Sequence, residues 1–237
     1  MIAVPSWVIP GTYRENLAFL ADKPQIQGVE LLFFIWDSEV NALLSAELPD
    51  LQGYASRFTF TAHLPDVLQP EHTELVQALS PYIRHCVLHP GPRERAETQA
   101  RIIRSWIEQF GPQKFLLENT GPGCLEEILP RVPPETPLCM DTGHLLLEGK
   151  SPAEFFERYR GRIQEIHLHR VDHSEAAEDR RLPDHRPIRP AEPWFQALAP
   201  GLAGFAGVIN LEVFSWREAE LSLAALGIKS EALPRAD

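Results

Sequence analysis

The stretch Pro137-Leu138-Cys139-Met140-Asp141-Thr142-Gly143-His144 contains, in eight residues, the pattern that decides the fold. A short apolar run ends at a carboxylate, Asp141, and is followed by turn-type residues and a histidine. The stretch predicts a strand that ends in a polar side chain, with Gly143 as the turn that lets the chain reverse direction. The same unit, closed by a helix-like stretch, recurs along the chain.

Eight strand-like runs alternate with eight helix-like runs, and the composition does not change between the two halves. The expected strands are residues 2–4, 28–34, 57–63, 82–89, 114–118, 138–141, 163–169 and 208–213. The expected helices are residues 14–21, 38–46, 71–79, 93–110, 125–129, a helix started by Ser151, 194–198 and 217–226. A polar loop is expected over residues 170–190.

This alternation is typical of an α/β protein with a parallel sheet. Eight units in one domain favour a closed (β/α)₈ TIM barrel over an open doubly wound sheet. No Gly-x-Gly-x-x-Gly follows the first expected strand, which weakens a dinucleotide-binding alternative. We therefore expect one barrel domain over residues 1–228 and a C-terminal tail over 229–237.

The composition is that of an ordinary globular protein: 44% of the 237 residues are hydrophobic and 23% are charged. The net charge of −11 argues against a nucleic-acid partner, because phosphate binding depends on Lys and Arg. The longest apolar run, residues 29–36, is too short to span a bilayer. The N-terminus carries no basic leader, so we expect a cytoplasmic protein. Cys86, Cys124 and Cys139 are expected to be reduced thiols.

In a barrel, catalytic groups lie at the carboxyl ends of the strands. The polar residues at these ends are acids and histidines: Glu30, His63, His89, Glu118, Asp141, His167 and Glu212, with His144 and His169 just beyond. Such residues, converging without a long basic side chain, predict a site for divalent ions such as Zn²⁺, Mn²⁺ or Mg²⁺. A single strand-end acid or histidine is more often hydrogen-bonded structure than a ligand, so this prediction depends on the whole set.

The members of this set do not carry equal weight. Glu118, Asp141, His167 and Glu212 are the strongest, because they end four successive strands. His63 and His89 could simply bind substrate. Glu30 lies early in its strand and could hydrogen-bond a ligand or another barrel residue.

Six segments resemble the xylose isomerase-like barrel superfamily, which includes family 2 apurinic endonucleases and many sugar-phosphate isomerases and epimerases. The segments are Ala62-His63-Leu64-Pro65, His89-Pro90-Gly91, Leu117-Glu118-Asn119, Cys139-Met140-Asp141-Thr142-Gly143-His144, Ile166-His167-Leu168-His169 and Leu211-Glu212. The resemblance covers nearly the whole chain. It implies one to three divalent ions, Zn²⁺ or Mn²⁺.

The resemblance also implies how the ligands divide. Glu118, Asp141, His167 and Glu212 would surround the principal ion. His63 and His89 would bind a second ion, with Glu118 bridging the two ions. His144 and His185, with Asp184, would bind a third. The chain departs from the endonucleases at residues 167–170, His-Leu-His-Arg in place of His-Leu-Asn-Asp, and at Pro183-Asp184-His185, where the acid adjoins the histidine. These departures put the third ion in question.

Within the superfamily, the chain is most similar to cobamide-remodelling phosphodiesterases. The similarity is carried by residues 6–10 (Ser-Trp-Val-Ile-Pro), 29–34 (Val-Glu-Leu-Leu-Phe-Phe), 184–185 (Asp-His) and 211–215 (Leu-Glu-Val-Phe-Ser). It implies hydrolysis of a small phosphoester through a metal-activated water.

Two enzymatic functions and one binding function compete. A phosphodiesterase would use two or three ions, with His63, His89, His144 and His185 among their ligands. An isomerase or epimerase would use one ion, with Glu118 and Glu212 moving a proton at carbon. A non-catalytic binding barrel would require a broken site. In each case we expect a small-molecule ligand, contacted by Glu30, His169 and Asp184, whereas the oligomeric state is left open.

Overall fold

The computed structural model describes residues 1–172 and 184–229. The predicted tail lies outside these residues except for Lys229, as does the middle of the predicted loop over residues 170–190. In the described part of the chain, no helix is long and apolar enough to cross a membrane. The three cysteines are free thiols, as expected.

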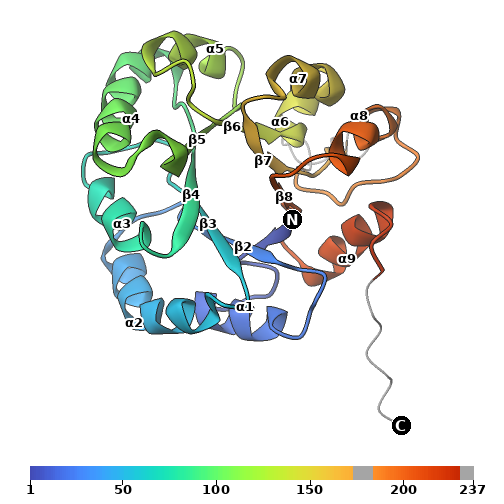
Figure 1. The fold of residues 1–237 in the computed structure, drawn as a ribbon, viewed down its shortest axis with the longest axis horizontal. Helices are drawn as coiled ribbons and strands as arrows, with labels where there is room; N and C mark the ends of the chain where they lie inside the picture. Colours follow the sequence, from blue (N-terminus) through green and yellow to red (C-terminus); the bar gives the residue numbers. More distant parts are fainter. Residues whose placement is uncertain (173–183, 230–237) are drawn as a thin grey trace, which may run out of the picture.

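Eight parallel strands form a closed barrel in sequence order, which confirms the predicted fold. The strands are β1 (Ile2–Pro5), β2 (Gly28–Leu32), β3 (Thr59–His63), β4 (Ile83–Leu88), β5 (Phe115–Glu118), β6 (Leu138–Asp141), β7 (Ile163–His167) and β8 (Val208–Asn210). The barrel closes where β1 pairs with β8, with Ile2 opposite Ile209. Figure 1 shows the strands at the centre and the helices around them.

The helices lie outside the barrel (Figure 1). They are α1 (Tyr13–Leu20), α2 (Ser38–Tyr54), α3 (His72–Leu79), α4 (Ala96–Phe110), α5 (Cys124–Ile128), α6 (Thr142–Leu147), α7 (Pro152–Tyr159), α8 (Pro193–Ala203) and α9 (Trp216–Ala225). Short 3₁₀ helices cover Arg93–Arg95, Pro112–Lys114 and Leu129–Arg131. Thr12 caps α1 in a full capping box, and Ser151 caps α7, which confirms the helix start expected at Ser151.

Two helices run past their predicted ends. We expected the second helix to end near residue 46 and the seventh near residue 198, but α2 continues through Pro49 to Tyr54 and α8 through Pro200 to Ala203. Burial of Leu44 and Leu51 on one face outweighs the backbone hydrogen bond that Pro49 cannot donate.

Another difference is α6, which begins where a turn was expected. Gly143 lies inside this helix and is not the predicted reversal of the chain. The helix starts because Asp141 acts as its N-cap: Asp141 Oδ1 accepts a hydrogen bond from the backbone N–H of His144 at 2.6 Å.

Strand alternation sends every second side chain into the barrel. His85 and Glu165 point inward below the strand ends, are fully buried, and bond through Nε2 and Oε2 at 2.5 Å. Glu165 Oε1 also accepts a 3.4 Å hydrogen bond from Thr61. Two residues further along, β3 carries His63 after Thr61 and β7 carries His167 after Glu165, and both histidines belong to the predicted site. The barrel interior therefore contains polar side chains at two successive levels.

We predict that Glu165→Ala destabilises the fold by about 3 kcal/mol or more, because it leaves a buried partner without its pair. The loss is large because Nδ1 of His85 already has no hydrogen-bond partner within residues 1–172 and 184–229. Urea denaturation measures the change. The matched control is Glu157→Ala, which removes a solvent-exposed pair with Arg160 and should cost less than about 0.5 kcal/mol. Equal losses in the two variants would contradict this account of the barrel interior.

Candidate metal centre

The predicted site residues gather at the carboxyl end of the barrel. His63, Glu118, Asp141 and His167 are the last residues of β3, β5, β6 and β7. His89 directly follows β4, and Glu212 lies two residues beyond β8. Side-chain atoms of His144, His169, Asp184 and His185 contact members of this set. The structure thus brings all of the predicted residues together.

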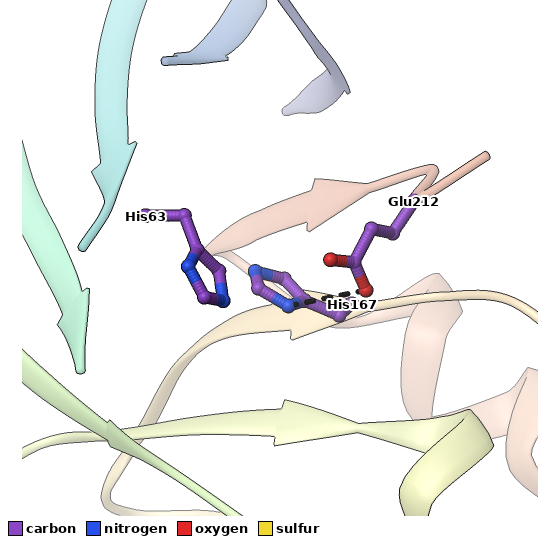
Figure 2. Close-up of side chains that lie close together, drawn as sticks. All are labelled: His63, His167 and Glu212. Carbon is purple, nitrogen blue, oxygen red and sulfur yellow. Dashed lines mark ion pairs between the residues drawn. The ribbon is translucent and has the colours of Figure 1, made fainter. Parts of the chain in front are cut away.

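Among the residues that the structure describes, three buried atoms at the centre of the site have no hydrogen-bond partner. They are Glu118 Oε2, His167 Nδ1 and Glu212 Oε2. His167 Nδ1 lies 3.7 Å from Glu118 Oε2 and 3.4 Å from Glu212 Oε2. Figure 2 shows His167 between His63 and Glu212. Unpaired buried polar atoms are costly, and a divalent ion held by imidazole nitrogen and carboxylate oxygens would satisfy all three.

A second group shares Glu118. Nε2 of His63 and Nε2 of His89 lie 3.3 Å and 3.4 Å from Glu118 Oε2. The candidate ligand atoms of these three residues all lie within 4.8 Å of one another. This arrangement fits the bridging role that the resemblance implies for Glu118.

A third group lies on the other side of Glu212. His169, His185 and Glu212 also offer ligand atoms that lie within 4.8 Å of one another. His169 Nε2 is 3.0 Å from Asp141 Oδ2, and its Nδ1 is 3.1 Å from Asp184 Oδ1. The ring of His169 is fully buried and stacks on that of His185, with ring centroids 4.4 Å apart. His169 was predicted to contact substrate, but it lies among the candidate ligands.

Five histidines of the site have one ring nitrogen engaged by the protein, among them His185, whose Nδ1 lies 3.3 Å from the carbonyl oxygen of Glu212. His63 Nδ1 and His144 Nδ1 donate to the carbonyl oxygens of Leu64 and Asn119, both at 2.9 Å. His89 Nδ1 is 3.0 Å from Asp66 Oδ1, and His167 Nε2 is 3.1 Å from Glu30 Oε1. Such contacts fix the tautomer and leave the other nitrogen free for a metal. Histidines in metal sites are oriented in this way.

The electrostatics of the site favour positive charge. Burial opposes protonation of His89, but Glu118 and Asp66 outweigh it and raise the pKa of His89 to about 9. Burial likewise opposes protonation of His144, but Asp141 and Glu118 raise its pKa to about 10. Burial alone would raise the pKa of the Glu118 carboxyl, yet the neighbouring histidines hold that pKa well below its usual range. Ionised carboxylates at this density attract a cation.

Glu30 lies deeper than a substrate contact. It is fully buried, and burial raises the pKa of its carboxyl. Its Oε1 contacts His167, and its Oε2 accepts a 2.5 Å hydrogen bond from Asn210. The sequence left open whether Glu30 hydrogen-bonds a ligand or another barrel residue. Its position favours the barrel residue, His167.

Several supporting residues were missed by the sequence analysis. Asn119 exchanges two hydrogen bonds with the backbone of Asp141, at 2.8 Å and 2.9 Å. The Thr142 hydroxyl is 3.0 Å and 2.7 Å from the carbonyl oxygens of His167 and His169. Asp66 holds His89. Asn119, Thr142 and Asp66 stand within three residues of a predicted ligand, so their proximity in sequence was the available signal.

Gly143 is required by the packing of the site. A Cβ at this position would lie 2.0 Å from Cε1 and 2.5 Å from Nδ1 of His169. Both distances are far below any real carbon contact, and His169 cannot move away because carboxylates hold both of its nitrogens. The glycine therefore allows α6 to approach His169 closely.

No family model matches the chain. A stretch of 53 residues is 42% identical to inosose dehydratase from Lacticaseibacillus casei, and it covers 22% of this chain and 17% of that protein. The match therefore spans less than a fifth of the dehydratase's length.

Solved structures with the same fold cover nearly all of the chain. A probable 3-DHS dehydratase involved in petrobactin synthesis from Bacillus anthracis has a TM-score of 0.66 at 15% identity, covering 94% of this chain and 98% of its own. A sugar phosphate isomerase/epimerase from Parabacteroides distasonis has a TM-score of 0.63 at 13% identity, covering 94% of each chain. Endonuclease IV from Thermus thermophilus has a TM-score of 0.56 at 14% identity, covering 95% of this chain and 97% of its own. At such identities, these likenesses establish a shared fold alone.

We expect Gly143→Ala to lower metal content and stability together, because the new methyl group collides with His169. The helix propensity of alanine would by itself add about 1 kcal/mol of stability to α6, so a loss must come from the collision. Metal analysis and thermal unfolding of the purified variant measure both effects. Gly53→Ala in α2 is the matched control, because its Cβ meets no atom within 4 Å. Unchanged metal content in Gly143→Ala would refute the proposed packing constraint.

We expect Glu30→Gln to weaken metal binding about 10- to 100-fold, the usual effect of losing a partner that orients a ligand. Glu30 accepts one hydrogen bond at each oxygen, whereas a glutamine has one acceptor oxygen and would leave His167 or Asn210 unmatched. Competition with a metal indicator dye measures the affinity. Glu108→Gln, on the exposed side of α4, should leave the affinity unchanged. If Glu30→Gln binds metal as tightly as the control, Glu30 does not orient His167.

Proposed function

We propose that the chain is a divalent-metal-dependent enzyme of the xylose isomerase-like barrel superfamily that hydrolyses a small phosphoester. The observation that carries this proposal is the sharing of carboxylates between adjacent ligand groups. Glu118 belongs to the central group and to the group with His63 and His89, and Glu212 belongs to the central group and to the group with His169 and His185. Bridging carboxylates are suited to a site with more than one ion.

Each candidate ion would be held by its own set of residues. Glu118, His167 and Glu212, with Asp141, would hold the principal Zn²⁺ or Mn²⁺ ion, and His63 and His89 a second. When bound, such ions neutralise phosphate charge and lower the pKa of a coordinated water. His144, Asp184 and His185 remain the candidates for a third ion. His169 lies between Asp141, Asp184 and Glu212, with ring nitrogens 3.0 Å, 3.1 Å and 3.3 Å from their carboxylate oxygens.

Isomerisation or epimerisation is the second candidate, and the comparisons favour it. A sugar phosphate isomerase/epimerase and a dehydratase are more similar in fold than endonuclease IV, and the short sequence match is to a dehydratase. This function would need Glu118 and Glu212 to move a proton at carbon. Glu118 has little freedom to do so: its Oε2 faces the three histidines 63, 89 and 167, and its Oε1 is 3.3 Å from His144 Nδ1. These contacts support a ligand role for Glu118 and leave its carboxylate less free to carry a proton.

The likeness to cobamide-remodelling phosphodiesterases stays a prediction, carried by the four sequence segments alone. The catalytic roles of Glu118 and Glu212 are also predictions. A non-catalytic barrel is the least favoured function, because the predicted ligand residues all lie together at one end of the barrel.

Metal content and His89→Ala together distinguish the two enzymatic functions. For a phosphodiesterase we expect two or three bound ions and chelator-sensitive hydrolysis of bis(p-nitrophenyl) phosphate. His89→Ala should lose one ion and about 100-fold or more in kcat, because a group that stabilises transition-state charge is removed. Elemental analysis and release of p-nitrophenolate give the readouts.

The isomerase function predicts a different pattern. It requires one exchangeable ion and activity on ketoses or ketose phosphates that survives His89→Ala but not Glu212→Gln. A single ion, with no chelator-sensitive phosphodiester hydrolysis, would refute the phosphodiesterase proposal.

A further inference from the structure

An apolar pocket of about 470 Å³ opens beside the candidate metal centre. Its walls come from residues that follow β1, β2 and β8, together with parts of α1 and α2. Trp7, Phe34 and Ile35 line it and are 53%, 47% and 67% exposed. Exposed aromatic and aliphatic side chains in a concavity of this size mark a ligand site more often than bare surface.

The pocket offers little to a hydroxylated ligand. Its three hydroxyl side chains already have protein partners. Ser6 Oγ accepts from Leu32 N at 3.1 Å, the Tyr13 hydroxyl donates to Leu32 O at 3.1 Å, and Thr12 Oγ1 accepts from Glu15 N at 3.4 Å. A sugar bound here would exchange most of its hydrogen bonds to water for contact with apolar side chains, which is costly. An apolar or aromatic group would lose nothing.

Two phenylalanines of the pocket wall also contact histidines of the metal centre. The ring of Phe34 lies 5.2 Å from that of His63, in an edge-on arrangement. The ring of Phe214 lies 4.7 Å from that of His185 and 6.5 Å from that of Phe34. Both phenylalanines line the pocket, so one wall is shared between the apolar space and the candidate ligands. The pocket and the candidate metal centre therefore lie side by side, with Phe34 and Phe214 between them.

We propose that the pocket binds an aromatic, non-reacting part of the substrate, so that the substrate class is a phosphoester carrying a flat apolar group and not a simple sugar phosphate. The proposal rests on the proposed hydrolytic function for the phosphoester part. Trp7 and Phe214 would contact the faces or edges of the bound ring, while Phe34 separates it from His63. Burial of one aromatic ring accounts for a preference of about tenfold or more over a methyl group.

Calorimetric titration of the metal-loaded chain with 1-naphthylphosphonate and methylphosphonate tests the proposal, because neither compound can be hydrolysed. We expect the naphthyl compound to bind at least about tenfold more tightly. Trp7→Ala and Ile35→Ser should reduce this ratio to about threefold or less, since each removes apolar surface from the pocket. The matched control is Leu221→Ser on α9, a 52% exposed apolar residue that does not line the pocket and should keep the wild-type ratio.

The possible outcomes separate this inference from the function on which it rests. Equal affinities, no binding of either compound, or a ratio that survives both pocket variants would overturn the inference. Phosphodiester hydrolysis without an aryl preference would leave the function standing and refute the pocket. An aryl preference without chelator-sensitive hydrolysis would support the pocket and refute the phosphodiesterase. Sedimentation of the same samples tests whether a second copy of the chain occupies the pocket instead. A dimer that dissociates in Trp7→Ala, together with no aryl preference, would overturn the inference.

Discussion

The repulsion among buried carboxylates at one end of the barrel is the constraint on which the rest of the site depends. Glu118, Asp141 and Glu212 are each 3% exposed or less, and they converge because parallel strands end on the same rim. Anions at this spacing are stable only if cations stand between them. His167 and His169 stand between them in the structure, and divalent ions would satisfy the atoms that the imidazoles leave unpaired.

The same constraint explains why backbone and ligand geometry are so closely linked at β6. Asp141 is at once the end of the strand, the N-cap of α6 and a contact of His169. By starting the helix immediately, Asp141 Oδ1 fixes the backbone of His144, and the ring of His144 then reaches Glu118 Oε1. A turn of the kind first expected around Gly143 would not place His144 in this way. The secondary structure is part of how the site is held together.

The barrel and most of the site could be predicted from the sequence because both depend on local patterns. A strand and its terminal acid or histidine are adjacent in the chain, as at Asp141. What could not be predicted joins distant residues: Glu30 meets His167 at a separation of 137 residues and Asn210 at 180. The contact between Gly143 and His169 also depends on how two strand ends meet. No periodicity encodes such contacts, so the role of Glu30 was left open and Gly143 was misplaced.

The mouth of the barrel is chemically asymmetric, and this asymmetry bears on the choice between functions. Apart from Glu30 on β2, the acids and histidines come from β3 to β7 and the segments that follow them and β8, whereas the apolar pocket lies over the ends of β8, β1 and β2. A polyhydroxylated sugar needs hydrogen-bond partners around its whole ring. A phosphoester of an aromatic group needs charge at one end and apolar surface at the other. Phe34, with its ring against His63 and half of its surface still exposed, lies at the boundary between these two environments. The arrangement matches a substrate with a charged reacting end and an apolar end, which is why the pocket and the ligand groups support the same function.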